Sequence, residues 1–128
     1  FEDINAMERY LARNGIAICK FFLHVSKKEQ KKRFLARLDE PAKNWKFSMK
    51  DGQERAHWDK YKHAYEDMIC NTATKHAPWH VVPADHKWFT RLVVSQAIIQ
   101  TLESLDLAFP KLSAEQRKEL EAARQTLR

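Results

Sequence analysis

The sequence predicts an α/β fold built on a parallel sheet. Two short apolar segments, at 16–25 and 79–82, are rich in β-branched and aromatic residues. Such runs are typical of strands that are buried on both faces of a parallel sheet. Each is followed by a polar turn and a helical pattern, which is the order of a βαβ unit. The chain has 128 residues, which suits one domain or part of one.

The first half of the chain alternates helix, strand and helix. A helix is expected over 3–14, where apolar residues recur on one face, and Gly15 favours its end because glycine accepts the left-handed conformation. The strand at 16–25 leads directly into Ser26 and Glu29. Their spacing matches a capping box and predicts a helix that starts at this point.

The remaining elements are bounded by prolines, glycines and further caps. They are the helix from Ser26 to about Asp39, a basic loop at 41–52, helices at 53–71 and 86–106, a strand at 79–82 ended by Pro83, and a charged terminal helix opened by a Ser113–Gln116 capping box. Two buried strands cannot form a stable parallel sheet with both faces covered. We therefore expect the chain to be the C-terminal part of a larger α/β domain.

Composition limits the class of protein and of partner. With 44% hydrophobic and 31% charged residues, the chain is expected to be globular, and it contains no apolar run of the roughly 20 residues that a transmembrane helix needs. Cys19 and Cys70 are predicted to be buried thiols of a cytoplasmic protein. The net charge of +6 favours an anionic partner, such as nucleic acid, a nucleotide, phosphate or an acidic protein, although a merely basic surface explains it equally well.

A basic helix and the loop after it are the first candidate site. Arg33 and Arg37 lie four residues apart, so they are expected to share a helix face, where like charges repel by about 0.2–0.5 kcal/mol. An anionic ligand would remove that penalty, and arginine suits phosphate oxygens. The alternative is a solvated basic face. The other cations of this region are Lys27, Lys28, Lys31, Lys32, Lys43, Lys46, Lys50 and Arg55.

The histidines between residues 76 and 86 suggest a metal site but do not support one. His76 is expected in a turn and His80 in a strand, and no second cluster offers four converging ligands. Asp85 is a candidate helix N-cap, a role compatible with ligand contact. The chain has two glycines and no G-x-x-x-x-G-K-[ST] pattern. A glycine loop that holds phosphate must therefore lie outside it.

Three stretches together strongly resemble the C-terminal half of the polyphosphate kinase 2 family. They are KFFLHVSKKEQKKRFLARLDEPAKNWKFS at 20–48, ERAHWDKYKHAYEDM at 54–68 and APWHVVPADHKWFTRLVVSQAI at 77–98. The resemblance covers residues 1–105 and leaves 106–128 as a helical tail. It implies part of a P-loop kinase fold, with three α/β/α layers and a parallel sheet. It also implies a helical lid at about 33–57, with the Walker A half and the Walker B-like aspartate upstream.

The resemblance also implies roles for individual residues. In the family, lid arginines stabilise phosphate charge, which assigns that catalytic role to Arg33, Arg37 and Arg55. The pattern W-K-x-S-x-x-D-x-x-x-R matches Trp45 to Arg55. Trp58 and Tyr61 follow it and are expected mainly to pack. The residues that the resemblance places near substrate are Lys43, Lys46, Asp51, Asp85 and Lys87.

The implied activity is phosphoryl transfer between inorganic polyphosphate and ADP, AMP or GDP. Mg²⁺ would be bound mainly by residues upstream of this chain, which alone is expected to be inactive. Polyphosphate, nucleoside mono-, di- and triphosphates and a second copy of the protein are the expected partners, and neither a membrane nor nucleic acid is. The alternative is a basic helical module that binds nucleic acid or another polyanion, with the aromatic residues at 45, 58, 61 and 65 as stacking groups. AMP or ADP preference, base specificity, direction and the ligand that the Pro83–Lys87 turn faces stay open.

Overall fold

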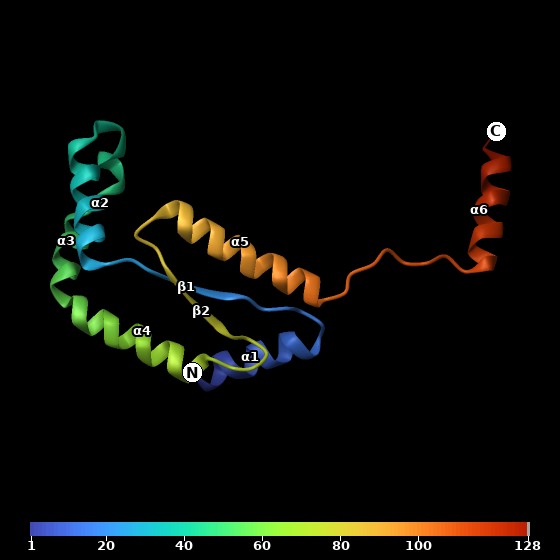
Figure 1. Cartoon of the computed structure of the whole chain (residues 1–128), viewed down its shortest axis with the longest axis horizontal. Coiled ribbons are helices and arrows are strands. Elements are labelled where there is room, and N and C mark those ends of the chain that lie inside the picture. The colour runs from blue at the N-terminus through green and yellow to red at the C-terminus, as the bar shows by residue number, and fades with distance from the viewer. Residues whose placement is uncertain (128) are drawn as a thin grey trace.

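The computed structural model describes residues 1–127 and contains two parallel strands with helices on both sides (Figure 1). Helix α5 lies on one side of the strands, and α1 and α4 lie on the other. The predicted α/β class and parallel pairing are confirmed. The elements are α1 (Glu2–Arg13), β1 (Lys20–His24), α2 (Lys27–Asp39), η1 (Pro41–Lys46), α3 (Met49–Glu54), η2 (Arg55–His57), α4 (Trp58–Thr72), β2 (Trp79–Pro83), α5 (Lys87–Ser104) and α6 (Ala114–Thr126).

Helix α1 ends where the sequence predicts, at a glycine. Gly15 has φ +81°, and its N–H donates to the carbonyl of Ala12 over 3.1 Å. The N–H of Ile16 donates to the carbonyl of Leu11 over 3.2 Å. These two bonds form a Schellman motif, which satisfies the last carbonyls of the helix and turns the chain toward β1.

Lys20 joins four elements at the N-terminal end of the sheet. Its ammonium donates over 2.7 Å to the Glu8 carboxylate of α1 and over 2.7 Å to the Thr72 carbonyl of α4. It also lies 5.1 Å from the centre of the Trp79 ring on β2. The side chains of Lys20 and Glu8 are only 11% and 13% exposed. The charge is therefore paired inside the protein rather than solvated.

The strands are shorter and more exposed than the sequence predicts. β1 begins at Lys20 instead of residue 16, and Leu23 and Val81 remain 50% and 56% exposed. Val82 and Ala84 of the second strand region are buried. The prediction of strands buried on both faces is wrong because, within residues 1–127, each strand has a neighbour along one edge only.

Residues 41–46 and 49–52 are helical, with a break at 47–48, so the prediction of a loop over 41–52 is wrong. Pro41 occupies the start of η1, a position that needs no backbone N–H. Asn44 returns two hydrogen bonds to the last carbonyls of α2, at Arg37 and Leu38. Ser48 caps α3 through a bond from the Lys50 N–H. The segment therefore forms a helical lobe with α2, at one end of the sheet (Figure 1).

Helix α6 stands apart from the rest of the structure (Figure 1). Its predicted capping box is confirmed: Ser113 Oγ accepts the Gln116 N–H, and Gln116 Oε1 accepts the Ser113 N–H. Arg128, the last residue of the predicted tail, lies outside the described residues. Across residues 1–127, no helix combines the length and the apolar character needed to cross a membrane.

Pro83 at the end of β2 makes the two edges of the sheet different. The next residue, Ala84, donates its N–H to the His24 carbonyl of β1 over 2.8 Å. Because successive N–H groups of a strand point to alternate sides, the backbone nitrogen of Pro83 faces away from β1. A proline there costs no bond of the ladder, and this is the position that proline takes in edge strands.

Candidate functional site

Two turns meet at the carboxyl ends of the strands, where α/β sheets bind their ligands. The turn after β1 contains Ser26, and the turn after β2 contains Ala84 and Asp85. Asp85 Oδ1 accepts the Ser26 N–H over 2.7 Å. Hydrogen bonds from the backbone and side chain of Ser26 lower the pKa of Asp85, and the nearby charge of Arg33 contributes further.

Asp85 therefore caps α2 rather than its own helix, α5. Helix α5 has His86 at its N-cap position, with no side-chain capping bond. At the start of α2, Ser26 Oγ accepts the Glu29 N–H over 3.1 Å, as predicted. The Ser26 N–H goes to Asp85, however, and not to Glu29. The predicted capping box is only half formed because the Glu29 carboxylate pairs with Arg33.

Arg33 is bound to the turn after β2. Its Nη2 donates to the carbonyls of Ala84 and Asp85 over 2.8 and 3.1 Å, and its Nε donates to Glu29 Oε1 over 2.9 Å. Its side chain is 31% exposed. The guanidinium thus uses the donors of Nε and Nη2 within the protein.

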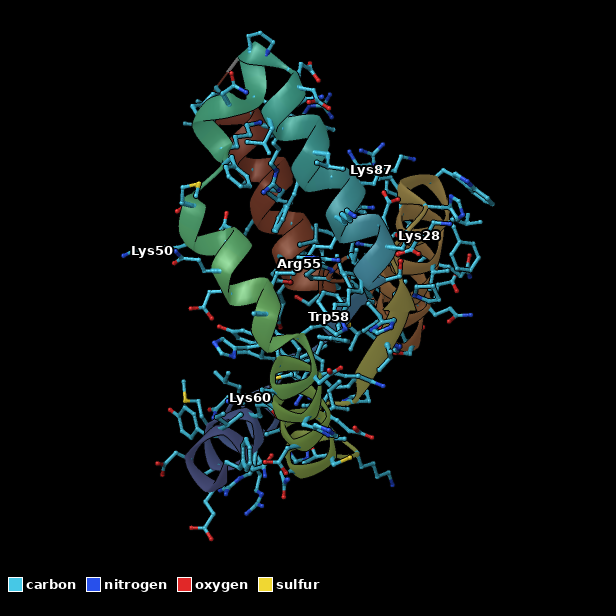
Figure 2. All side chains as sticks on the ribbon, turned by 90° about the vertical axis from the view of Figure 1, so that its left-hand side faces the viewer. Lys28, Lys50, Arg55, Trp58, Lys60 and Lys87 are labelled. Atoms are coloured by element: carbon cyan, nitrogen blue, oxygen red, sulfur yellow. The ribbon has the colours of Figure 1, made fainter. Side chains whose placement is uncertain are left out.

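Arg55, at the start of η2, makes a corresponding contact with the first turn of α2. Its Nη1 donates to the Lys27 carbonyl over 2.9 Å and to Gln30 Oε1 over 2.7 Å. Its guanidinium lies 5.9 Å from the centre of the Trp58 ring. Arg55 and Trp58 are both half-buried and lie close together, whereas Lys50 points outward from α3 (Figure 2).

Arg37 differs from the other two arginines. It lies one turn after Arg33, but it faces the Phe34 ring, whose centre is 5.6 Å away. Among the described residues its side chain has no hydrogen-bond or ion-pair partner. Arg33 and Arg37 therefore do not converge in this structure, and the donors of Arg37 remain open to a ligand.

The other predicted substrate residues lie in two places. Lys43 pairs with Glu40, and Lys46 lies 5.0 Å from the Trp45 ring centre, both in exposed η1. Lys87 is exposed in the first turn of α5, directly after the Asp85 turn. Asp51 is half-buried beside a small cavity of about 220 Å³ between α2, α3 and α4. The structure thus brings Arg33, Arg55 and Asp85 to the base of α2 and leaves Lys43 and Lys46 on η1, beyond the other end of α2.

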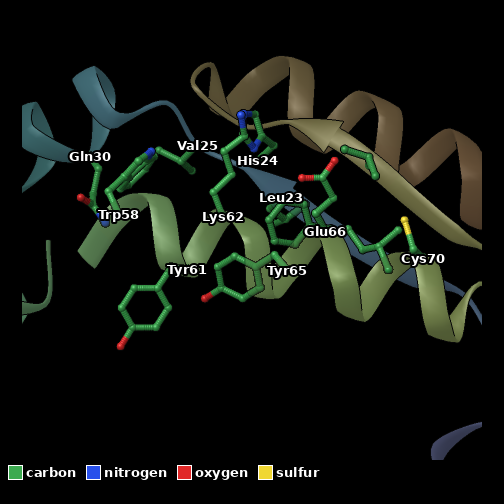
Figure 3. A pocket seen from close by; sticks show the side chains of 13 residues that line it. Leu23, His24, Val25, Gln30, Trp58, Tyr61, Lys62, Tyr65, Glu66 and Cys70 are labelled. Atoms are coloured by element: carbon green, nitrogen blue, oxygen red, sulfur yellow. The ribbon is translucent and has the colours of Figure 1, made fainter. Parts of the chain in front are cut away.

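A larger apolar groove of about 490 Å³ runs between β1 and α4 (Figure 3). Trp58, Tyr61 and Tyr65 line one wall of it from successive turns of α4. A hydrogen bond to Glu54 raises the pKa of Tyr61. Cys70 also lines this groove and is exposed, so the prediction that it is buried is wrong; Cys19 is half-buried.

The described residues do not fit a metal ion. Across residues 1–127, no group of three or more His, Cys, Asp and Glu side chains is placed to hold one. His80 stacks on Phe21 at 5.2 Å, and the Nε2 atom of His76 is buried without a hydrogen-bond partner. These histidines belong to the packing of the strands and of the turn before β2.

Sequence reasoning missed two residues of the candidate site. Glu29 contacts Arg33 and Gln30 contacts Arg55; Glu29 was predicted as part of a capping box, and Gln30 was not singled out. The i to i+4 spacing of Glu29 and Arg33 is a signal that could have indicated their ion pair. No local pattern indicates Gln30, because its partner lies 25 residues further along the chain.

Comparisons with known proteins give a consistent result. The family model described as polyphosphate kinase 2 matches residues 1–110. The chain is 58% identical to an uncharacterized protein of Leptolyngbya boryana over 127 residues, which cover 99% of this chain and 93% of the relative. It is 51% identical to the ADP-polyphosphate phosphotransferase of Rhodopseudomonas palustris over 127 residues, or 99% of this chain and 44% of that protein.

A solved structure shows the same arrangement of elements. The crystal structure of polyphosphate kinase 2 from Arthrobacter aurescens TC1 superposes with a TM-score of 0.84 at 44% identity. The match covers 95% of this chain and 44% of that one. The chain thus spans less than half the length of the enzyme of known structure and of the phosphotransferase that it resembles.

Proposed function

Because the chain belongs to the polyphosphate kinase 2 family, we propose that the intact protein is a polyphosphate-dependent nucleotide kinase. It transfers a terminal phosphoryl group between inorganic polyphosphate and a nucleotide, with ADP as the first acceptor to test and AMP and GDP after it. The observation that carries this proposal is the family match over residues 1–110. The meeting of two polar turns at the carboxyl ends of the strands supports it.

The lid supplies positive charge to the transfer. In the forward direction, an oxygen of the ADP β-phosphate forms a bond to the terminal phosphorus of polyphosphate as the bridging P–O bond breaks. Negative charge is spread over the transferred group, and fixed cations stabilise it. Arg37 has free donors for this role, and Lys43 and Lys46 on η1 and Lys87 at the start of α5 add charge around the same ligands.

Residues outside this chain complete the site. We assign the binding of Mg²⁺ and the glycine loop to them, since the described residues offer no set of metal ligands. Residues 1–105 form the lid-bearing part of the catalytic domain, with the lid at about 33–57, and 106–128 form a tail. On this assignment the chain alone is inactive. The exposed apolar side chains of α5, including Trp88 and Leu92, are consistent with a homo-oligomer.

The test is ATP formation by the full-length protein from ADP, polyphosphate and Mg²⁺, measured with luciferase. We expect ATP that depends on polyphosphate, and a loss of about 10- to 100-fold in kcat/KM for Arg37→Ala, in line with one lost transition-state contact. Omitting polyphosphate controls for contaminating kinases. Polyphosphate binding without ATP formation would reject the kinase and favour the polyanion-binding module.

A further inference from the structure

Both ends of the lid are fastened to the base of α2 by arginines. At the entry, Arg33 binds Glu29 and the carbonyls of Ala84 and Asp85. At the exit, Arg55 binds the Lys27 carbonyl and Gln30. The helical segment between these two arginines contains the remaining lid cations.

The partners of these arginines are backbone carbonyls and side chains of the frame. A guanidinium that directly meets a phosphate needs its donor fork free for oxygens of the ligand. In Arg33, Nη2 instead donates to two carbonyls and Nε donates to the Glu29 carboxylate, so each pair of neighbouring donors that could bind a phosphate bidentately has lost at least one member. Arg37, one turn further along the same helix, has no such partner among the described residues. Arg33 and Arg37 therefore have different environments, although their four-residue spacing places them on one face of α2.

Asp85 contributes to the same junction from the turn after β2. Its carboxylate accepts the Ser26 N–H, while its own carbonyl accepts from Arg33. The turn after β2 thus receives a bond from the start of α2 and a second bond from two turns later. These two bonds, both donated from the α2 side to Asp85, fix the direction in which α2 leaves the sheet.

We propose that Arg33 and Arg55 are positioning residues that clamp the two ends of the lid, with Glu29 and Gln30 as their partners. The charge of the phosphates is met by the lid cations between them, above all Arg37. This assignment rests on the proposed kinase activity for its kinetic consequences. The clamp itself is a property of the fold and is tested separately.

Conservative substitution separates a clamp from a charge contact. Lysine keeps the positive charge but cannot bind a carboxylate and two carbonyls with one planar fork. We therefore expect Arg33→Lys to lower kcat/KM of the full-length enzyme as much as Arg33→Ala does, on the order of 10- to 100-fold, as for a misplaced catalytic group. Arg37→Lys is expected to retain more activity than Arg37→Ala.

Glu29→Gln gives the opposite expectation under the two assignments. It removes the ion pair with Arg33 while keeping the size of the side chain, and the bonds from Nη2 to the two carbonyls remain. A clamp predicts a lower kcat/KM, because Arg33 loses one of the groups that orient it. A direct phosphate contact predicts equal or higher activity, because a competing carboxylate charge is gone. Arg124→Lys on the separate helix α6 is the matched control and is expected to match the wild type.

Amide hydrogen–deuterium exchange tests the clamp without using activity. In the full-length protein, Glu29→Gln and Arg55→Lys are expected to speed exchange within 34–54 while β1 and β2 keep their protection. Unchanged exchange in the lid, or an active Arg33→Lys enzyme, overturns the clamp. If the wild type forms no ATP, the proposed kinase activity fails, and the exchange result still decides whether the two arginines fasten the lid.

Discussion

Removing Glu8 tests the buried charge at the N-terminal end of the sheet. Glu8→Ala leaves the Lys20 ammonium, whose side chain is 11% exposed, without its carboxylate partner. Breaking a buried ion pair from one side costs about 3–5 kcal/mol. Because Lys20 keeps its bond to the Thr72 carbonyl and its place against the Trp79 ring, we expect the lower end, about 3 kcal/mol.

The assay is thermal and urea unfolding of the full-length protein. A loss of about 3 kcal/mol corresponds to a fall in Tm of roughly 6–12 °C for a domain of about 150–250 residues. The double variant Glu8→Leu with Lys20→Met removes both charges and is expected to be more stable than Glu8→Ala, since no unpaired charge is then buried. Glu2→Ala, on an exposed position of the same helix, is the control and is expected to change stability by less than about 0.5 kcal/mol.

Two results would refute this reasoning. One is a Glu8→Ala protein as stable as the wild type, which would mean that water reaches Lys20 freely. The other is a double variant less stable than Glu8→Ala, which would mean that the apolar stems of the two side chains, rather than their charges, hold the four elements together.

Four further predictions follow from individual contacts. Gly15→Ala is expected to cost about 1 kcal/mol of unfolding free energy, because its φ of +81° disfavours an L side chain although the space around it is empty. Ser26→Ala removes the cap of α2 and should cost about 1 kcal/mol, measured by urea unfolding. Because the pKa of Asp85 is lowered in the folded protein, its carboxylate stabilises the fold at pH values above its unfolded pKa of about 3.9. This stabilisation is lost as the pH falls through the lower folded pKa. Asp85→Asn should remove that part of the acid dependence of stability, measured by unfolding at several pH values. The raised pKa of Tyr61 should appear as an ultraviolet titration midpoint above about 10 that returns toward this value in Glu54→Gln.

Local patterns predicted the elements but not the junctions between them. The helix end at Gly15 and the capping box at Ser113 were correct because each involves residues a few positions apart. The half-formed box at Ser26 was missed because its second acceptor, Asp85, lies 59 residues away. The local sequence does not show whether Glu29 or Asp85 accepts the Ser26 N–H.

In the candidate site, too, the sequence indicated the residues but not the groups that they contact. Charge and spacing singled out Arg33, Arg37 and Arg55 as candidate site residues, and the structure places Arg33 and Arg55 at one junction. Helical periodicity puts Arg33 and Arg37 on one face of α2. It cannot show that the carbonyls of Ala84 and Asp85 bind Arg33 and leave Arg37 without such a partner. The exposure of Cys70 could not be predicted from the local sequence either, because it depends on the groove between α4 and β1.

The missing N–H of Pro83 has a consequence for how the sheet can be extended. An incoming strand that approached β2 would meet a gap in the row of donors, while the outer edge of β1 carries no proline from Lys20 to His24. A further strand is therefore expected to pair with the outer edge of β1 rather than with β2. Because an unpaired strand edge can bind other chains, β1 is the edge of this sheet that needs to be covered.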